Sequence, residues 1–127
     1  MDIMKFENNT PIGVIKIKGP FGEKKLEATI DTGAFKSLIS LDLCKELGLH
    51  LKEEREVRGV SEKPVKAKIF WAEIVFQDKK INTVVGFNLP VDKNAREFEK
   101  ALIGRDILES FRLTVDFKDK EIEFEDC

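Results

Sequence analysis

The sequence predicts a mainly β protein with two or three short helices, folded as one domain. Apolar and polar residues alternate through much of the chain, which is the pattern of strands with one buried face. The 127 residues are the size of a single domain, and the mixture of 42% hydrophobic with 36% charged residues is typical of a folded globular protein. No linker, repeat or low-complexity segment divides the chain, so residues 1–127 are expected to form one domain.

The first strands are predicted on both sides of an early turn. Residues 15–18 alternate isoleucine with lysine, and residues 19–22 read Gly-Pro-Phe-Gly, which predicts a turn. Residues 26–30 alternate again and lead directly into Asp31, which gives a second strand. A third, short strand is expected over residues 37–40.

The middle of the chain predicts a helix and then a β-hairpin. A helix is expected over residues 41–47, because two leucines lie four residues apart and Gly48 follows the last turn. Residues 54–59 and 65–76 are predicted as the arms of a hairpin with a Ser-Glu-Lys-Pro bend. Residues 81–87 are predicted as a further strand.

The last part of the chain predicts a short helix and a closing hairpin. Residues 92–100 are polar and are expected to form a loop or a short helix. Residues 106–109, Asp-Ile-Leu-Glu, resemble an Asp-led capping box that opens a short helix. Residues 113–117 and 122–124 alternate on both sides of a Lys-Asp-Lys turn, which predicts a hairpin.

The composition makes several partners and locations unexpected. A net charge of −2, from 22 basic and 24 acidic side chains, offers no large positive surface for a phosphate backbone, so no nucleic acid is expected as a partner. The longest uncharged run, residues 81–91, is far shorter than the ~20 apolar residues of a membrane helix, so no membrane is expected either. The first six residues lack the apolar stretch of a signal peptide, and Cys44 and Cys127 form no disulfide framework. We therefore expect a cytoplasmic protein with reduced thiols.

The scarcity of histidine argues against a zinc site and against a Ser-His or Cys-His nucleophile. His50 is the single histidine, and no cysteine or carboxylate lies around it at the spacing of a zinc site. It follows the end of a predicted helix and is expected at the surface. We therefore expect no metal and no cofactor. Cys44 is expected to be a small core residue rather than a nucleophile, because no suitable base is evident.

The segment Asp31-Thr32-Gly33-Ala34 is the most informative part of the chain. Alone, Asp-Thr-Gly predicts only a turn at the end of a strand. Here an apolar strand leads into Asp31, and some seventy residues later Leu102-Ile103-Gly104 is followed by a short amphipathic helix. A hairpin with Gly59 near its bend lies between the two motifs. This order of features, over roughly residues 12–124, resembles the retropepsin family of aspartic proteases.

The resemblance implies a closed, barrel-like acid-protease fold and a role for each motif. It implies that Asp31 is the catalytic carboxylate and that Thr32 hydrogen-bonds across a dimer axis to the loop of the other subunit. Gly33 would let the backbone come close to the carboxylate and the substrate.

The resemblance also assigns residues around the catalytic loop. Leu102, Ile103 and Gly104 would pack beneath the loop that contains the aspartate. Gly59 and Val60 would lie near the tip of a flap that covers the substrate, and Ala34 would lie beside the substrate. Further candidates for lining the substrate pockets are Phe35, Val60 and Leu89.

The resemblance further implies a homodimer. Hydrolysis of a peptide bond by this chemistry needs a general acid and a general base at once, and two close carboxylates share one proton. The chain has one Asp-Thr-Gly, so a second copy would supply the second Asp31. The expected activity is that of an aspartic endopeptidase, and the expected substrate is a peptide or unfolded protein bound as an extended strand.

Several positions depart from the retroviral pattern. Phe35 and Lys36 follow Ala34 where acidic residues are usual, so Arg105 must find another partner, such as the acidic C-terminal residues or a neighbouring chain. The bend at residues 61–64 is not rich in glycine, and the closing hairpin is longer than in compact viral members. Ala34 cannot donate a hydrogen bond to a carboxylate, so we expect an activity optimum less acidic than that of pepsin-like enzymes.

Two other functions fit the same sequence. A non-catalytic peptide-binding or dimerisation module could use the same fold, because a fold does not dictate its function. A carrier that binds a small molecule in a barrel-like interior is a third possibility. Asp31 favours the protease over both.

Overall fold

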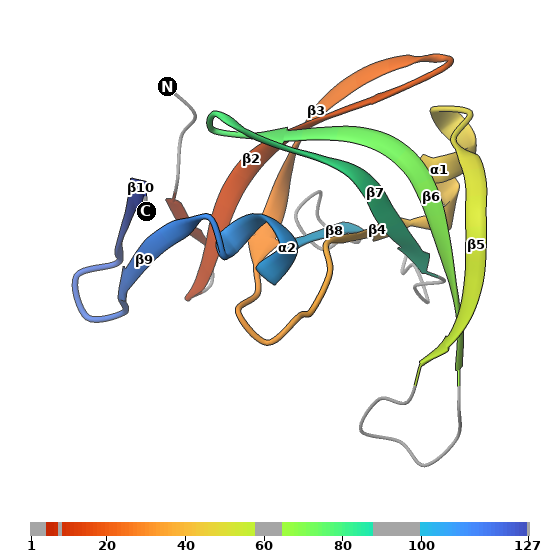
Figure 1. Cartoon of the computed structure of the whole chain (residues 1–127). Coiled ribbons are helices and arrows are strands. Elements are labelled where there is room, and N and C mark those ends of the chain that lie inside the picture. Colours follow the sequence, from red (N-terminus) through yellow and green to blue (C-terminus); the bar gives the residue numbers. More distant parts are fainter. Residues whose placement is uncertain (1–4, 8, 58–64, 88–99, 127) are drawn as a thin grey trace.

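The computed structural model describes residues 5–7, 9–57, 65–87 and 100–126. These residues form ten strands and two short helices (Figure 1). In chain order they are β1 (Lys5–Glu7), β2 (Thr10–Gly19), β3 (Gly22–Ile30), β4 (Leu38–Ser40), α1 (Leu41–Glu46), β5 (His50–Val57), β6 (Val65–Phe76), β7 (Lys79–Phe87), β8 (Ala101–Ile103), α2 (Arg105–Leu108), β9 (Phe111–Asp116) and β10 (Glu121–Asp126). The prediction of a mainly β fold is confirmed.

Eight strands form one sheet that bends back on itself. Their order is β1-β2-β3-β8-β4-β7-β6-β5, and β2 also pairs with β6. This additional pairing joins residues 16–18 of β2 to residues 73–75 of β6, although the two strands lie far apart in the strand order. The arrangement is barrel-like, and the closed form of the barrel stays a prediction.

The β2–β3 hairpin supplies much of the core. Its strands alternate as the sequence predicts, so one face is buried while the lysines of the other face lie in solvent. The two strands pair from Ile12 opposite Thr29 to Gly19 opposite Gly22. Gly22 has a φ of +142°, a conformation that residues with a side chain rarely adopt, so glycine is required at this turn.

Helix α1 begins and ends close to the predicted positions. The hydroxyl of Ser40 accepts a hydrogen bond from the amide of Leu43 at 3.3 Å, which caps the first turn. Leu43 and Leu47 are both buried, as their spacing predicts. Gly48 follows with a φ of +65° and ends the helix.

Helix α2 does not begin with the predicted capping box. Its N-cap is Gly104, which offers no side-chain cap, and the helix starts one residue before Asp106. The amides of Ile107 and Leu108 donate to the carbonyl oxygen of Gly104. The carboxylate of Asp106 is therefore free to bind elsewhere, and it turns toward the loop that follows β3.

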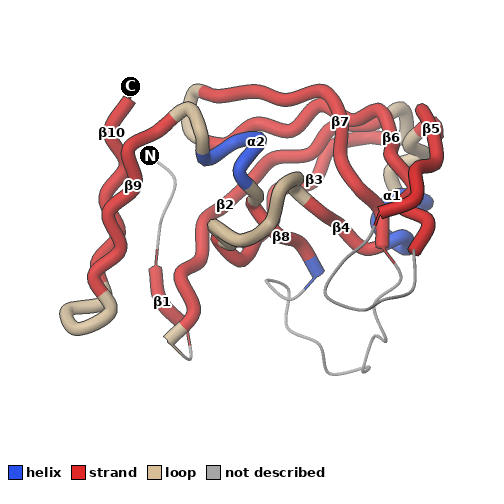
Figure 2. Tube along the Cα trace, turned by 60° about the horizontal axis from the view of Figure 1, so that its bottom comes forward, coloured by secondary structure: helices blue, strands red, loops and turns tan. Residues whose placement is uncertain are grey.

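The closing hairpin forms a separate two-stranded sheet, as the sequence predicts. Strands β9 and β10 pair in register from Phe111 opposite Asp126 to Asp116 opposite Glu121. Figures 1 and 2 show this hairpin beside β1 and on the opposite side of the molecule from β5. The rings of Phe111 and Phe124 contact each other and Phe76 of the main sheet, with centroid distances of 5.1 to 5.9 Å.

One predicted strand is longer in the structure than expected, and several predicted features lie outside the described residues. The arms of the predicted hairpin pair as β5 and β6, but β5 begins earlier, at His50, which is exposed as expected. The short strand β1 has no counterpart among the predicted elements. The predicted bend at residues 61–64, the positions Gly59, Val60 and Leu89, and most of residues 92–100 lie outside the described residues. Within the described ranges, neither helix is long and apolar enough to cross a membrane.

Candidate active site

Asp31 lies at the point where β3 leaves the sheet. The short strand β8 lies between β3 and β4, parallel to β3 and antiparallel to β4. Residues 31–37 therefore form a loop that leaves the sheet on one side of β8 and re-enters it on the other, next to α2 (Figure 2). The side chain of Ile103 in β8 is fully buried below this loop, and that of Leu102 is half-buried.

Backbone hydrogen bonds fix the position of the Asp31 carboxylate. The amide of Asp31 donates to the carbonyl oxygen of Ile103 at 3.0 Å. The amide of Gly33 donates to Oδ1 of Asp31 at 2.9 Å, and the amide of Ala34 donates to the carbonyl oxygen of Asp31 at 3.2 Å. A carboxylate held by the backbone in this way keeps one orientation, which a catalytic acid or base requires.

Gly33 leaves space for this close approach. A Cβ at position 33 would lie 3.2 Å from Oδ1 of Asp31, which is tighter than most contacts of a methyl group. The backbone of Gly33 is not in the left-handed region, so the reason for glycine is space beside the carboxylate rather than its φ angle.

The other end of the loop is fastened to the start of α2. The amide of Arg105 donates to the carbonyl oxygen of Ala34 at 2.8 Å. A Cβ on Gly104 would lie 2.5 Å from the carbonyl carbon of Lys36 and 2.9 Å from the amide nitrogen of Ser37. Only glycine lets β8 and the loop pack at this distance.

Ser37 and Asp106 complete this attachment. Both carboxylate oxygens of Asp106 accept from the amide of Ser37 at 3.0 Å, and Oδ1 also accepts from the Ser37 hydroxyl at 2.7 Å. The same hydroxyl accepts from the amide of Gly104 at 3.0 Å. Because Ser37 is buried, each of these polar groups needs its partner inside the protein.

The tip of the loop is exposed. Thr32 and Gly33 lie at the surface, and within the described part of this chain the Thr32 hydroxyl has no hydrogen-bond partner. Asp31 itself is half-buried. The described residues of one chain therefore present a single oriented carboxylate next to an accessible loop tip.

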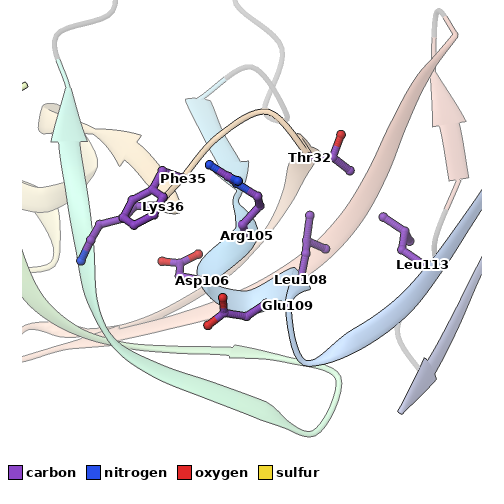
Figure 3. A pocket seen from close by; sticks show the side chains of 8 residues that line it. All are labelled: Thr32, Phe35, Lys36, Arg105, Asp106, Leu108, Glu109 and Leu113. Carbon is purple, nitrogen blue, oxygen red and sulfur yellow. The ribbon is translucent and has the colours of Figure 1, made fainter. Parts of the chain in front are cut away.

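A pocket of about 460 Å³ lies between this loop, α2 and β9 (Figure 3). Thr32 and Phe35 line it from the loop, Arg105 and Leu108 from α2, and Leu113 from β9. The guanidinium of Arg105 lies 5.4 Å from the centre of the Phe35 ring. Arg105 thus contacts Phe35, and among the described side chains it forms no ion pair with the acidic C-terminal residues that the sequence suggested.

A second pocket, of about 240 Å³, lies between the loop and the β5–β6 hairpin. Phe35 contributes to this pocket as well, and its role in lining a substrate pocket stays a prediction. The pocket is lined by Phe35, Lys36, Leu38, Arg55, Ala67, Ile69 and Val85. We refer to it below as the hairpin pocket.

The described residues offer no other reactive centre near the loop. Among them no three histidine, cysteine or carboxylate side chains cluster as metal ligands. Cys44 is buried in the core, as predicted, and burial raises the pKa of its thiol to about 12. A thiol with this pKa is not a nucleophile at neutral pH.

The sequence did not single out Ser37, and it assigned Asp106 to a different role. Their contact joins residues 69 positions apart, so no local pattern could predict it. A small hydroxyl residue at the start of a buried strand is the only local signal for Ser37, because a buried hydroxyl needs a polar partner.

Comparison with known proteins agrees with this geometry. The model of a family described as aspartyl protease matches residues 15–107. No curated protein matches the chain. The structure is similar to that of a retropepsin-like aspartic protease from Rickettsia conorii, with a TM-score of 0.63 and 21% identity over 96% of this chain and 89% of that chain. It is also similar to EIAV protease complexed with the inhibitor HBY-793, with a TM-score of 0.56 and 18% identity over 84% of this chain and 92% of that chain.

Proposed function

We propose that this chain, which belongs to the aspartyl protease family and has a retropepsin-like fold, is an endopeptidase. In this proposal it acts as a homodimer. The observation that carries the proposal is the Asp31 carboxylate, which Gly33 orients at 2.9 Å on a loop with an exposed tip. Asp31, Thr32 and Gly33 are the catalytic residues in this proposal, and we call the loop of residues 31–37 that contains them the catalytic loop.

Two Asp31 carboxylates, one from each subunit, perform the reaction. Held close together they cannot both be ionised easily, so they share one proton. The ionised carboxylate takes a proton from a water molecule, which attacks the carbonyl carbon of the peptide bond, while the protonated carboxylate donates to the carbonyl oxygen. The two apparent pKa values of such a pair belong to the pair and not to either aspartate.

A second copy is needed because the chain has a single Asp-Thr-Gly and so supplies one catalytic aspartate of this kind. Asp106 follows the Leu102-Ile103-Gly104 motif. Its carboxylate already accepts hydrogen bonds from Ser37 and from the amide of Ile107. The exposed Thr32 hydroxyl is free, within the described residues, to bind the loop of the partner subunit. A symmetric dimer would bring both loops together at its axis.

The substrate is a peptide or an unfolded protein segment that binds as an extended strand. It lies between the catalytic loop and the β5–β6 hairpin, with Ala34 below it and Gly59 and Val60 near the flap above it. Main-chain hydrogen bonds supply much of the affinity, and pockets select alternate side chains. In this proposal the hairpin pocket, between the loop and the β5–β6 hairpin, takes one of these side chains. The cytoplasmic location stays a prediction.

The test compares the purified protein with an Asp31→Asn variant. Both are incubated with a mixture of unfolded proteins between about pH 3 and pH 8, and new peptide termini are identified by mass spectrometry. We expect cleavage by the native protein and none by the variant. The optimum should be less acidic than that of pepsin-like enzymes, because Ala34 has no hydroxyl to stabilise the charged aspartate.

Two outcomes would contradict this proposal. Equal cleavage by both proteins would mean that the activity does not depend on Asp31. No cleavage by either protein, with both shown to be folded and dimeric, would favour a peptide-binding module on the same fold. An optimum near pH 2 would contradict only the argument from Ala34.

A further inference from the structure

The hairpin pocket combines an aliphatic floor with a charged rim. Leu38 of β4, Ala67 and Ile69 of β6 and Val85 of β7 form the floor. The other lining residues, which we call the rim, are Phe35 and Lys36 from the loop of residues 31–37 and Arg55 from β5; Phe35 and Arg55 are exposed, and Lys36 is half-buried. A side chain that lies along the pocket would therefore contact mainly apolar groups, and it would meet cations only on the side of Lys36 and Arg55.

The two cations of the rim are not equivalent. A nitrogen of Arg55 lies 2.9 Å from a carboxylate oxygen of Glu53, which is also 3.7 Å from the ammonium of Lys52. Arg55 therefore already has an ion-pair partner on the same strand, although Lys52 shares it. Among the described residues Lys36 has no ion-pair partner, so its ammonium is the uncompensated charge of the rim.

Two acidic residues near Lys36, Asp106 and Glu109, could in principle form an ion pair with its ammonium. Asp106 and Glu109 line the neighbouring 460 Å³ pocket together with Lys36. The carboxylate of Asp106 is already bound by the amide and hydroxyl of Ser37, and neither acid forms an ion pair with Lys36. Figure 3 shows the Lys36 side chain extending away from Asp106 and Glu109.

The backbone of Lys36 is held firmly in place. Its carbonyl group packs against Gly104, and the next residue, Ser37, is bound to Asp106 through both its amide and its hydroxyl. The backbone of Lys36 is therefore fixed, and its side chain is one of the residues that line the hairpin pocket.

We propose that Lys36 makes the protein select peptides that present an acidic side chain, glutamate in particular, to the hairpin pocket. This inference rests on the proposed function, because the pocket is a substrate site only if the peptide lies along the catalytic loop. The methylene groups of a glutamate would lie on the aliphatic floor, and its carboxylate would reach the Lys36 ammonium at the rim. A lysine or arginine in the same place would meet an uncompensated positive charge and would be disfavoured.

The experiment uses three peptides that differ at one position, which holds glutamate, glutamine or lysine. The position is chosen from the cleavage sites that the native protein makes in a peptide library, and kcat/KM is measured for each peptide. The variants are Lys36→Met, which keeps the length of the side chain, and Lys36→Glu, which reverses its charge. Lys68→Met is the matched control, because Lys68 is an exposed lysine of β6 that does not line the pocket.

We expect the native protein to prefer the glutamate peptide over the glutamine peptide by about fivefold, the upper range for a solvent-exposed ion pair. Lys36→Met should remove this preference, and Lys36→Glu should reverse it toward the lysine peptide. The Lys68→Met control should keep the native ratio. An unchanged ratio in both Lys36 variants would overturn the inference, and so would an equal change in the Lys68→Met control.

The failure of this inference can be told apart from the failure of the proposed function. The same peptides are titrated onto the Asp31→Asn protein, with and without Lys36→Glu, and binding is measured by fluorescence anisotropy. If no peptide is cleaved but glutamate is preferred in binding and this preference needs Lys36, the selectivity stands and the protease proposal fails. If the peptides are cleaved but their charge makes no difference to kcat/KM, the proposed selectivity is contradicted and the protease proposal is not.

Discussion

Gly104 lies so close to the catalytic loop that a larger residue has no space. A methyl group there would overlap the carbonyl carbon and oxygen of Lys36, which are backbone atoms and cannot rotate away. We predict that Gly104→Ala lowers the free energy of unfolding by about 1–3 kcal/mol, the usual cost of overpacking. It should also reduce kcat/KM strongly, because the loop that contains Asp31 must shift. Urea unfolding and the peptide cleavage assay measure the two effects.

Gly22→Ala is the matched control for this prediction. Gly22 has a φ of +142° and no other group within 4 Å of an added Cβ, so its substitution costs backbone strain of about 1–3 kcal/mol without crowding. It lies in the β2–β3 turn, outside the catalytic loop, and should leave kcat/KM unchanged. A Gly104→Ala protein with native activity would show that the contact with Lys36 does not position the loop.

Cys44 should react with thiol reagents only when the protein opens. Burial raises the pKa of its thiol from 9.0 to about 12, and the thiol is enclosed by the core. We predict that, in a Cys127→Ser background, Cys44 is labelled at pH 8 far more slowly in the native protein than in urea. Labelling can be followed with a chromogenic disulfide. Equal rates in both conditions would mean that Cys44 is accessible in the folded state.

The raised pKa of Cys44 predicts that the stability of the folded protein decreases at high pH. The folded state favours the neutral thiol, so this contribution is complete below pH 9.0 and is lost as the pH rises toward about 12. The difference in unfolding free energy between the native protein and Cys44→Ala should therefore shrink over this range. A difference that stays constant over the same range would contradict this assignment.

The β9–β10 hairpin depends on a few aromatic contacts with the main sheet. Phe124 of β10 contacts the rings of Phe76 and Phe111 at centroid distances of 5.1 and 5.2 Å. We predict that Phe124→Ala destabilises the protein by about 2 kcal/mol, because a half-buried ring loses part of its packing. Hydrogen exchange should increase in β9 and β10 more than in β2 and β3.

Phe117→Ala provides the comparison for this hairpin. Phe117 is 62% exposed and contacts Phe6 at 5.6 Å, outside the cluster of three rings. Its removal should leave hydrogen exchange in β9 and β10 nearly unchanged. If both substitutions had the same effect, the hairpin would be held by general apolar burial and not by the ring cluster.

At the scale of the whole molecule, the proposed dimer predicts that inactive subunits inhibit active ones. Mixing the native protein with a ninefold excess of Asp31→Asn, followed by subunit exchange, should leave only about a tenth of the native subunits in native pairs. The activity per native subunit should fall in proportion. The same mass of an unrelated protein serves as the control, and activity that does not change on mixing would contradict a site shared between subunits.

The elements of the fold were largely predictable because their signals are local. Alternation in β2, β3, β6 and β9 reports which face of each strand is buried, and the spacing of Leu43 and Leu47 reports the buried side of α1. Gly22 and Gly48 have positive φ values at the turn and the helix end where the sequence predicts them. The prediction failed at α2, where the Asp-x-x-Glu pattern suggested a cap, although Asp106 instead binds Ser37.

The sequence by itself determined the mainly β class, most strands, helix α1 and the motif around Asp31, because periodicity and turn residues act over a few positions. Only the tertiary structure decided that β8 lies between β3 and β4 and that Ser37 binds Asp106. It also decided that Arg105 lies on Phe35 and that Lys36 lines an apolar pocket and has no ion-pair partner in the described part of the chain. The contacts of Ser37 with Gly104 and Asp106 join residues 67 and 69 positions apart, and a local pattern states that a residue is buried but not which distant residue it meets.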